Sequence, residues 1–315
     1  MRFLEFSSLF DVMAAFPTEE SCARYLEVLR WNGNIASPFE RVSKVYTCKN
    51  GKYKCDATNK YFNVRTGTIF QDSKMPLRKW IMALYIFTSH KKGISSYQLA
   101  RDLSITQKTA WFVLHRLRYA MSKGSFWDLP LKGTVEADEC YLGGREENKH
   151  EHLRNKDKDG FKVGSKRKEV VFGMVERGGK AIIKHVPAAK VGFVVPVIKA
   201  NLVAGSQLMT DEHHLYARMG ADYIHSTVEH GAKEYVRGLT HTNTIENLWS
   251  VLKRGIYGTY HFTSVKHLQA YCDEFAFRFN RRKLSEYDKV NSCLLNTTKG
   301  TLKYKTLVRK GGANA

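Results

Sequence analysis

Three acidic residues in the second half of the chain stand where carboxylates could share divalent metal ions. Asp138 lies in the strand-like run VEADECYLGG, and Asp211 follows the apolar run QLMT. Glu246 lies in a segment with helical periodicity, and Lys253 follows two turns later on the same helix face. Carboxylates are hard ligands of the kind that Mg²⁺ takes, and two such ions about 4 Å apart can bind both oxygens of an in-line displacement at phosphorus. The pattern therefore predicts a site for phosphoryl transfer.

Neighbouring residues leave the ligand set open. Glu136 lies two residues before Asp138, so both side chains should project from one face of a strand, whereas Glu139 should project from the other face. Four residues could take the place of one of the three acids: Glu136, Glu212, Asn243 and Asn247. A zinc-dependent reaction is the less favoured alternative, because the nearby histidines lack the i, i+4 spacing of a helical zinc motif. These histidines are His213, His214, His230 and His241.

The segments around these acids alternate between strand and helix patterns. Apolar runs bounded by turn residues predict strands at 134–142, 169–176, 181–186, 207–211 and 223–227. Longer periodic segments predict helices at 191–203, 244–256 and 268–281. Strands followed by interleaved helices are typical of an α/β fold with a mixed sheet. We therefore expect one α/β domain over residues 130–290.

Residues 76–125 have the pattern of a helix-turn-helix. Two short helices, at 95–103 and from Thr106 onward, flank a tight turn, and Thr106 is a favourable N-cap. The second helix carries an apolar stripe, as a recognition helix requires on its inner face. Its opposite face should contact DNA through Gln107, Lys108, Trp111, His115 and Arg118. Arg254, on the helix that carries Glu246, is a further expected DNA contact.

The two ends of the chain are simpler. Residues 1–75 contain a short helical segment and then strand-like runs around Asn50-Gly51, a dipeptide that favours a tight hairpin turn. This predicts a small antiparallel ribbon. Residues 291–315 are rich in lysine and are expected to form a solvated basic tail.

The charge balance points to a polyanionic partner. Lys and Arg number 51 against 30 Asp and Glu, which gives a net charge of +21 over 315 residues. Nucleic acid is the commonest partner of so basic a chain. Hydrophobic residues make up 43% of the chain, too many for a disordered protein, and no signal peptide or membrane span is expected. The six cysteines have no regular spacing, so we expect reduced thiols and a cytoplasmic, nucleoid-associated protein.

Most of the chain resembles the ISXO-type DDE transposases of insertion-sequence family 1595. The matching stretches, in the family's order, are residues 65–70, 72–80, 98–103, 105–111, 138–144 and 241–255. The resemblance implies a ribonuclease H-like catalytic core, two Mg²⁺ or Mn²⁺ ions, and cleavage and joining of double-stranded DNA at terminal inverted repeats and a target. It also implies a homodimer or higher oligomer on DNA.

The resemblance also assigns roles to individual residues. Asp138 and Asp211 match the first and second acids, Glu246 the third, and Lys253 the basic residue on the same helix. The family varies between Glu and Asn at its third position, so Asn243 stays open as an alternative to Glu246.

One departure from the family concerns its N-terminal zinc ribbon, which carries two Cys-x-x-Cys pairs. The corresponding positions here are Ser37, Glu40, Cys55 and Thr58. One thiolate cannot form a tetrahedral zinc site, so we expect no zinc and a ribbon held together by aromatic residues. The expected aromatic residues are Tyr46, Tyr53, Tyr61 and Phe62. The loss of these ligands keeps two alternatives open: a transposase-derived DNA-binding regulator that no longer cuts, and a ribonuclease H-like nuclease that cuts without joining.

Overall fold

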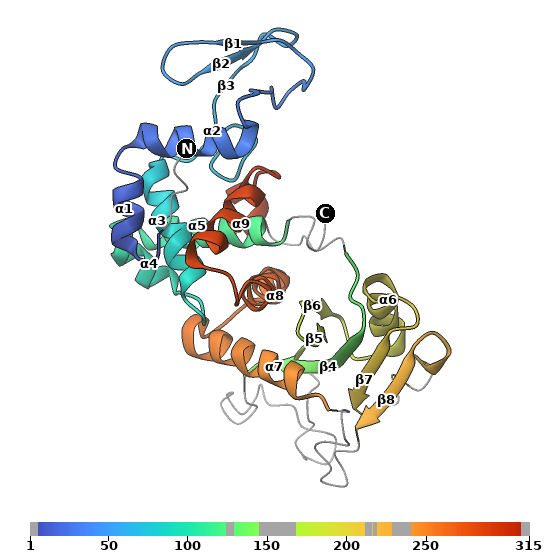
Figure 1. Cartoon of the computed structure of the whole chain (residues 1–315). Coiled ribbons are helices and arrows are strands. Elements are labelled where there is room, and N and C mark those ends of the chain that lie inside the picture. The colour runs from blue at the N-terminus through green and yellow to red at the C-terminus, as the bar shows by residue number, and fades with distance from the viewer. Residues whose placement is uncertain are drawn as a thin grey trace. The chain divides into compact units, whose positions relative to one another are not determined.

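The computed structural model describes residues 6–123, 129–144, 168–211, 216, 219–228 and 241–309. The chain divides into two compact units, one formed by residues 126–280 and the other by the segments before and after them. In Figure 1 the first of these runs from green to orange, and the second combines the blue and cyan elements with the red ones. None of the helices in the described part combines the length and apolar composition that a membrane span requires.

The unit of residues 126–280 is built on a five-stranded mixed sheet with the order β6-β5-β4-β7-β8 (Figure 1). The strands are β4 (Thr134–Leu142), β5 (Glu169–Glu176), β6 (Ala181–Val186), β7 (Gln207–Asp211) and β8 (Ile224–Val228). β4, β7 and β8 are parallel, whereas β5 is antiparallel to both β4 and β6. The predicted mixed α/β sheet is confirmed, and four of its strands have the predicted bounds.

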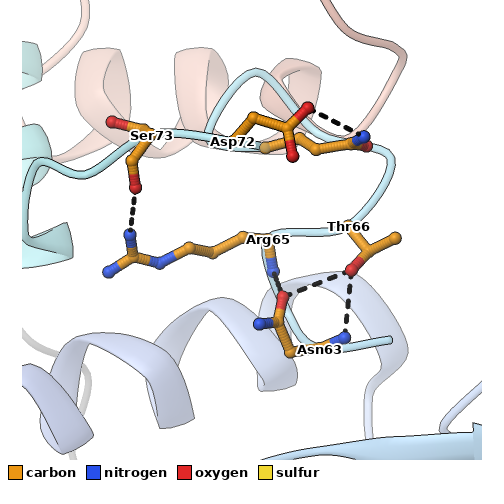
Figure 2. A pocket seen from close by; sticks show the side chains of 6 residues that line it. Asn63, Arg65, Thr66, Asp72 and Ser73 are labelled. Carbon is orange, nitrogen blue, oxygen red and sulfur yellow. Dashed lines mark hydrogen bonds between the residues drawn. The ribbon is translucent and has the colours of Figure 1, made fainter. Parts of the chain in front are cut away.

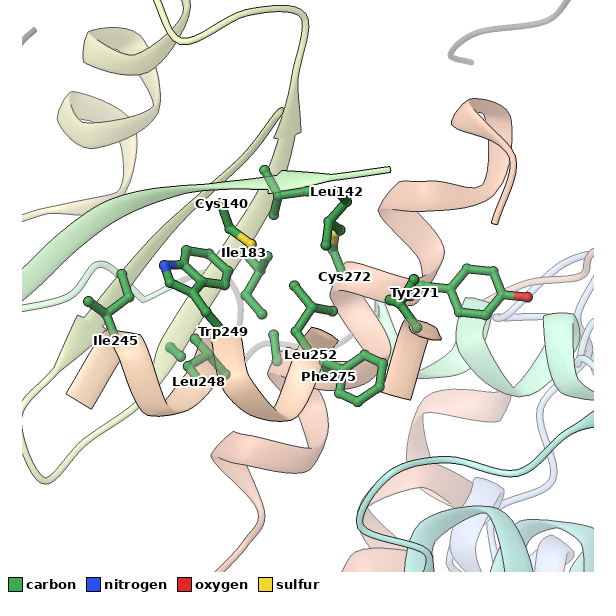
Figure 3. Packing of buried hydrophobic residues seen from close by; sticks show 14 of the residues in the cluster. Cys140, Leu142, Ile183, Ile245, Leu248, Trp249, Leu252, Tyr271, Cys272 and Phe275 are labelled. Carbon is green, nitrogen blue, oxygen red and sulfur yellow. The ribbon is translucent and has the colours of Figure 1, made fainter. Parts of the chain in front are cut away.

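Helices cover both faces of this sheet. α6 (Val191–Asn201) packs on one face through Val194 and Ile198, in a core shared with Val135 and Ala137 of β4. α7 (Asn243–Gly255) and α8 (Val265–Asn280) pack on the other face, and α7 continues into a π-helical turn (Ile256–Tyr260). Figure 3 shows this second core, in which Cys140 and Leu142 meet residues of α7 and α8. Successive residues of β4 thus alternate between two helical layers.

The other unit is mainly helical. Its helices are α1 (Leu9–Ala15), α2 (Glu19–Trp31), α3 (Leu77–Ser89), α4 (Ser96–Leu103), α5 (Gln107–Met121), α9 (Glu286–Thr297) and α10 (Tyr304–Val308). α9 packs against α2, α3 and α5, and buries Val290, Cys293 and Leu294 at helical spacing. Part of the segment predicted as a solvated tail is therefore a packed helix, because its apolar stripe has a partner in the N-terminal half of the chain.

A small antiparallel sheet of the same unit consists of β1 (Val45–Thr47), β2 (Tyr53–Cys55) and β3 (Tyr61–Phe62). Its aromatic core is formed by Tyr53 and Phe62, which pack against Trp31 of α2. Tyr46 and Tyr61 are 42% and 62% exposed, so the expectation that they hold the ribbon together is wrong. Strand alternation points these two side chains away from α2.

Cys55 lies where one ligand of the family's zinc ribbon is expected. Its side chain is buried, and hydrogen bonds with Ser37 and Ser43 lower the pKa of the thiol to about 7. The sulfur lies 3.3 Å from the Ser43 hydroxyl. Hydroxyl groups thus surround the one cysteine that remains at the four ligand positions.

Candidate active site

Three carboxylates meet where β4 and β7 diverge. Asp138 and Glu139 lie on β4, Asp211 is the last residue of β7, and one oxygen of each lies within 4.8 Å of the others. The parallel ladder between these strands ends at the pair Glu136–Met209. All three acids follow that last pair along their strands. Asp138 and Asp211 are thus brought together as predicted.

Glu139 was missed, because strand alternation places it on the face opposite Asp138. The backbone keeps that alternation: the Asp138 side chain accepts a hydrogen bond from α7, whereas Glu139 accepts one of 2.5 Å from the hydroxyl of Tyr216. One oxygen of each carboxylate nevertheless lies within 4.8 Å of the other, past the last β4–β7 pair. The adjacent acids in ADECY were the only sequence signal for this arrangement.

Burial raises the pKa values of two carboxyl groups in the cluster above those of free carboxylic acids. It raises the pKa of Asp138 to about 6, and the charges of Asp211 and Glu246 add to the shift. Burial also raises the pKa of Glu139 to about 7, with the charges of Asp138 and Asp211 acting in the same direction. Hydrogen bonds from Trp249 and Tyr216 oppose these shifts. A cation would relieve the repulsion among the three groups.

A glycine gives Trp249 the space from which it reaches Asp138. The indole Nε1 donates a hydrogen bond of 2.9 Å to Asp138 Oδ2. Gly173 pairs with Asp138 across the β4–β5 ladder, and a Cβ atom at position 173 would lie 2.4 Å from the indole ring. Only glycine lets the ring lie this close to the strand. Figure 3 shows Trp249 between α7 and the sheet.

Glu246 is exposed on α7 and lies outside the group of three oxygens within 4.8 Å. Its charge raises the pKa of Asp138, so it acts on the cluster, and it accepts a hydrogen bond of 3.1 Å from the Thr242 hydroxyl. Asn243, its predicted alternative, is exposed as the first residue of α7.

Lys253 lies near Cys140, two residues beyond Asp138 on β4. Burial raises the pKa of the Cys140 thiol to about 11, and the ammonium group of Lys253 opposes that shift. Lys253 and Arg254 are both exposed near the end of α7. Two cations are therefore available to a phosphate on this side of the sheet.

Glu136, the other predicted alternative ligand, is fully buried and holds the start of α7 in place. It accepts hydrogen bonds from the backbone N–H groups of Thr244 and Ile245, at 2.8 and 3.0 Å, and from the Thr244 hydroxyl. Arg177 Nε donates a fourth bond of 2.8 Å. A carboxylate at a helix N-terminus also interacts favourably with the helix dipole. These bonds use both carboxylate oxygens of Glu136 to hold the start of α7 and the Arg177 side chain. Glu136 is not part of the acidic cluster.

We expect Glu136→Gln to lower the free energy of unfolding by about 3 kcal/mol, because it leaves Arg177 without its buried carboxylate. Urea unfolding measures the loss. Glu176→Gln, at the partly exposed end of β5, is the matched control and should change stability by less than about 1 kcal/mol. If Glu136→Gln instead abolished metal binding at unchanged stability, Glu136 would be a ligand.

The pKa shifts predict a pH-dependent affinity for divalent ions. Asp138 and Glu139, with pKa values of about 6 and 7, must lose their protons before they bind a cation. We expect Mn²⁺ affinity to rise steeply from about pH 5 and to level off above about pH 7.5. Because raised carboxyl pKa values favour the protonated folded state, the metal-free protein should lose stability over the same range.

Calorimetric titration with Mn²⁺ in two buffers of different ionisation enthalpy measures the released protons directly. Glu139→Gln should release fewer protons than the parent protein near pH 6.5, the midpoint between the two pKa values. An affinity that is constant between about pH 5 and 8 would show that these carboxylates do not bind the ion.

The residues predicted to contact DNA from α5 differ in exposure. Lys108 is exposed and Gln107 half-buried, and Gln107 donates a hydrogen bond to Ser96 of α4. Trp111 is half-buried, in an edge-to-face contact with Tyr304. His115 and Arg118 are buried, because α3, α4 and α9 pack against α5. The Arg118 guanidinium lies 5.8 Å from the centroid of the Phe87 ring of α3. The expectation that His115 and Arg118 contact DNA is therefore corrected.

Several predicted alternatives lie outside the described residues: Glu212, His213, His214 and His230. His241 is described, and its Nδ1 lies 3.3 Å from Glu136 rather than in the acidic cluster. Among the residues that the structure describes, Asp138, Glu139 and Asp211 are the one group of three or more potential metal ligands.

Comparison with known proteins agrees with this geometry. Residues 130–280, from just before β4 to the end of α8, match the ISXO2-like transposase domain family. Over 253 residues the chain is 28% identical to a protein of Halobacterium salinarum that is named as an uncharacterized protein in transposable element ISH50. The alignment covers 76% of this chain and 83% of that protein. Residues 130–280 of the chain are therefore similar to the ISXO2-like transposase domain family.

Proposed function

We propose that the chain is a DNA transposase that cleaves the ends of its element and joins them to target DNA. The observation that carries the proposal is the meeting of Asp138, Glu139 and Asp211 at neighbouring parallel strands inside a transposase-family domain. The mixed sheet, with one antiparallel strand and helices on both faces, is compatible with a ribonuclease H-like core.

The residues present fit a pair of divalent cations. Carboxylate oxygens within 4.8 Å of one another form the hard, anionic donor set that Mg²⁺ and Mn²⁺ prefer. Asp138 and Asp211 would hold the ions, with Glu246 as the third acid. When bound, such ions stabilise charge on the attacking and leaving oxygens at phosphorus.

Other residues of the chain support this centre. Trp249 fixes one oxygen of Asp138, and Tyr216 fixes one oxygen of Glu139, so both carboxylates are held before any ligand arrives. Lys253 and Arg254 would bind the DNA phosphates next to the reacting one. Their exposure leaves them open to solvent and to a large substrate.

Both proposed reactions are displacements at phosphorus, so one centre can perform them in turn. Water first breaks a phosphodiester bond and leaves a 3′-hydroxyl at the end of the element. That hydroxyl then attacks a phosphodiester of the target strand, so that a new phosphodiester forms and the 3′-oxygen of the target strand leaves as a hydroxyl. Bringing two ends together implies at least a dimer on DNA.

DNA binding would rest on the basic charge of the chain and on the α4–α5 pair. α4 and α5 are joined by a tight turn in which Ser104 is left-handed, and Ser95 and Thr106 cap the two helices. The start of α5, with half-buried Gln107 and exposed Lys108, is the part of a recognition helix that contacts base edges. We propose that these residues bind the terminal inverted repeats.

A strand-transfer assay tests the function. Labelled DNA that carries the inverted repeats flanking the coding region is incubated with the protein, a target plasmid and Mg²⁺ or Mn²⁺. Joined product supports a transposase, and reactions in EDTA should give none. Cleavage without joining would indicate a nuclease, and binding without cleavage would indicate a regulator.

A further inference from the structure

A second candidate site lies in the helical unit, apart from the acidic cluster. It is a pocket of about 270 Å³ between the loop 72–75, the outer side of α5 and the start of α10. Its lining includes three cationic side chains, Lys74, Lys108 and Arg116, and three aromatic ones, Trp80, Phe112 and Tyr304. One carboxylate, that of the exposed Asp72, also lines the pocket. Its volume is slightly below the ~300 Å³ lower end of small-ligand pockets, which suits one small planar group and not a duplex.

Arg116 is the most unusual member of this lining. It is only 5% exposed, and its guanidinium stacks 4.4 Å from the centroid of the Phe112 ring. Nε donates a hydrogen bond of 3.1 Å to the carbonyl of Leu302. Among the residues described here, no carboxylate lies within ion-pair distance of this guanidinium, although the charge of Asp72 acts on it at longer range. A buried cation without a paired anion favours an anionic ligand.

The mouth of the pocket adds further cations and an aromatic wall. Lys74 and Lys108 are exposed, and Lys108 Nζ lies 5.2 Å from the centroid of the Tyr304 ring. Tyr304 is 37% exposed and meets Phe112 edge to face, with ring centroids 5.4 Å apart. Aromatic faces beside cations are the features by which proteins bind unpaired bases and their phosphates.

The loop that closes one side of the pocket is held in place. Arg65 donates hydrogen bonds of 3.1 Å to the carbonyls of Ser73 and Met75. Figure 2 shows Arg65 reaching Ser73 across a neighbouring polar pocket of about 290 Å³. The indole of Trp80 donates to the Ser73 hydroxyl at 3.0 Å. The wall is therefore formed before a ligand binds, which lowers the cost of binding.

We propose that this pocket binds one unpaired nucleotide of a DNA strand, with the base against Tyr304 and Phe112 and the phosphate at Lys108 and Arg116. The site differs from the acidic cluster in location and chemistry, and it differs from groove recognition because it needs an exposed base. An unpaired nucleotide is available at a frayed or cleaved DNA end. The site would distinguish such ends from intact duplex.

The test compares two labelled probes of about eight nucleotides. One is oligothymidine, and the other is an abasic strand with the same number of phosphates. Binding is followed by fluorescence anisotropy in EDTA, so neither strand cleavage nor the catalytic proposal affects the result. We expect the protein to bind oligothymidine at least about 5-fold more tightly, since stacking of one base contributes about 1–3 kcal/mol.

Single-residue variants show whether the preference for oligothymidine comes from this pocket. Tyr304→Leu and Phe112→Leu, on different helices, should each bind oligothymidine and the abasic strand with nearly equal affinity. Tyr304→Phe should keep the preference for oligothymidine. Lys108→Gln should weaken both probes to a similar extent. Phe10→Leu is the matched control, because Phe10 of α1 is 82% exposed in the same unit and lines no part of the pocket.

Two outcomes would overturn the proposal. Equal affinity of the parent protein for both probes would mean that only phosphates are bound. A preference for oligothymidine that Tyr304→Leu and Phe112→Leu leave unchanged, with both variants folded by near-ultraviolet circular dichroism, would place base recognition elsewhere.

Discussion

Replacing Asp138 with asparagine is expected to reduce strand cleavage and joining by at least about 10³-fold, the scale of effect when one charge-stabilising group is removed from a reaction centre. The amide is similar in shape and still accepts the hydrogen bond from Trp249, so the packing of α7 should survive. The substitution removes one negative charge from the cluster. Gel-based cleavage and strand-transfer assays measure the loss.

Asp222→Asn is the matched control for this variant. Asp222 lies in the same unit, is paired with Lys199 at the surface, and should be replaceable at full activity. Asp138→Asn should retain DNA binding in EDTA and should be at least as stable as the parent protein at pH 8, because burial disfavours the charged form of Asp138. If the variant cleaved DNA at more than about one tenth of the parent rate, the acidic cluster would not be the reaction centre.

The strands that carry the acids could be predicted from the sequence because each is a short apolar run with clear ends. β5 and β6 meet at the turn Gly178-Gly179, and β7 ends at Asp211. Asp211 is the last residue of β7, but Asp138 lies in the middle of β4, so the strand ends alone did not predict that the two acids meet. That expectation came from the three acids taken together and from the family resemblance.

The site predictions that were wrong share one cause. The periodicity of a sequence shows whether a face of a helix or strand is polar, but it does not show which element packs on that face. The polar side of α5 was predicted to face DNA, but His115 and Arg118 are buried where other helices pack against α5, and Arg118 lies over Phe87 of α3. Alternation placed Glu136 on the same strand face as Asp138, but it did not show that a helix N-terminus binds Glu136. Glu139 was missed because alternation does not show where a ladder ends.

We infer the third acid from how α7 runs along β4. The start of α7 binds Glu136, Trp249 reaches Asp138, and Lys253 lies near Cys140. Four residues of helix rise about 6 Å, which is close to the length of two strand residues. Every second residue of β4 therefore lies opposite about every fourth residue of α7. Glu246 precedes Trp249 by three residues, which places it on the same face.

We therefore expect Glu246→Gln to reduce cleavage by at least about 10²-fold, and Glu139→Gln by only about 10-fold. Glu139 is bound by Tyr216, and its pKa of about 7 leaves it partly protonated at neutral pH, which makes it the poorer ligand. Asn243→Ala, at the exposed first position of α7, should change the rate by less than about 3-fold. The three rates are measured on the same labelled end DNA at saturating Mn²⁺. If Glu139→Gln were the more severe variant, the third acid would come from β4 and not from α7.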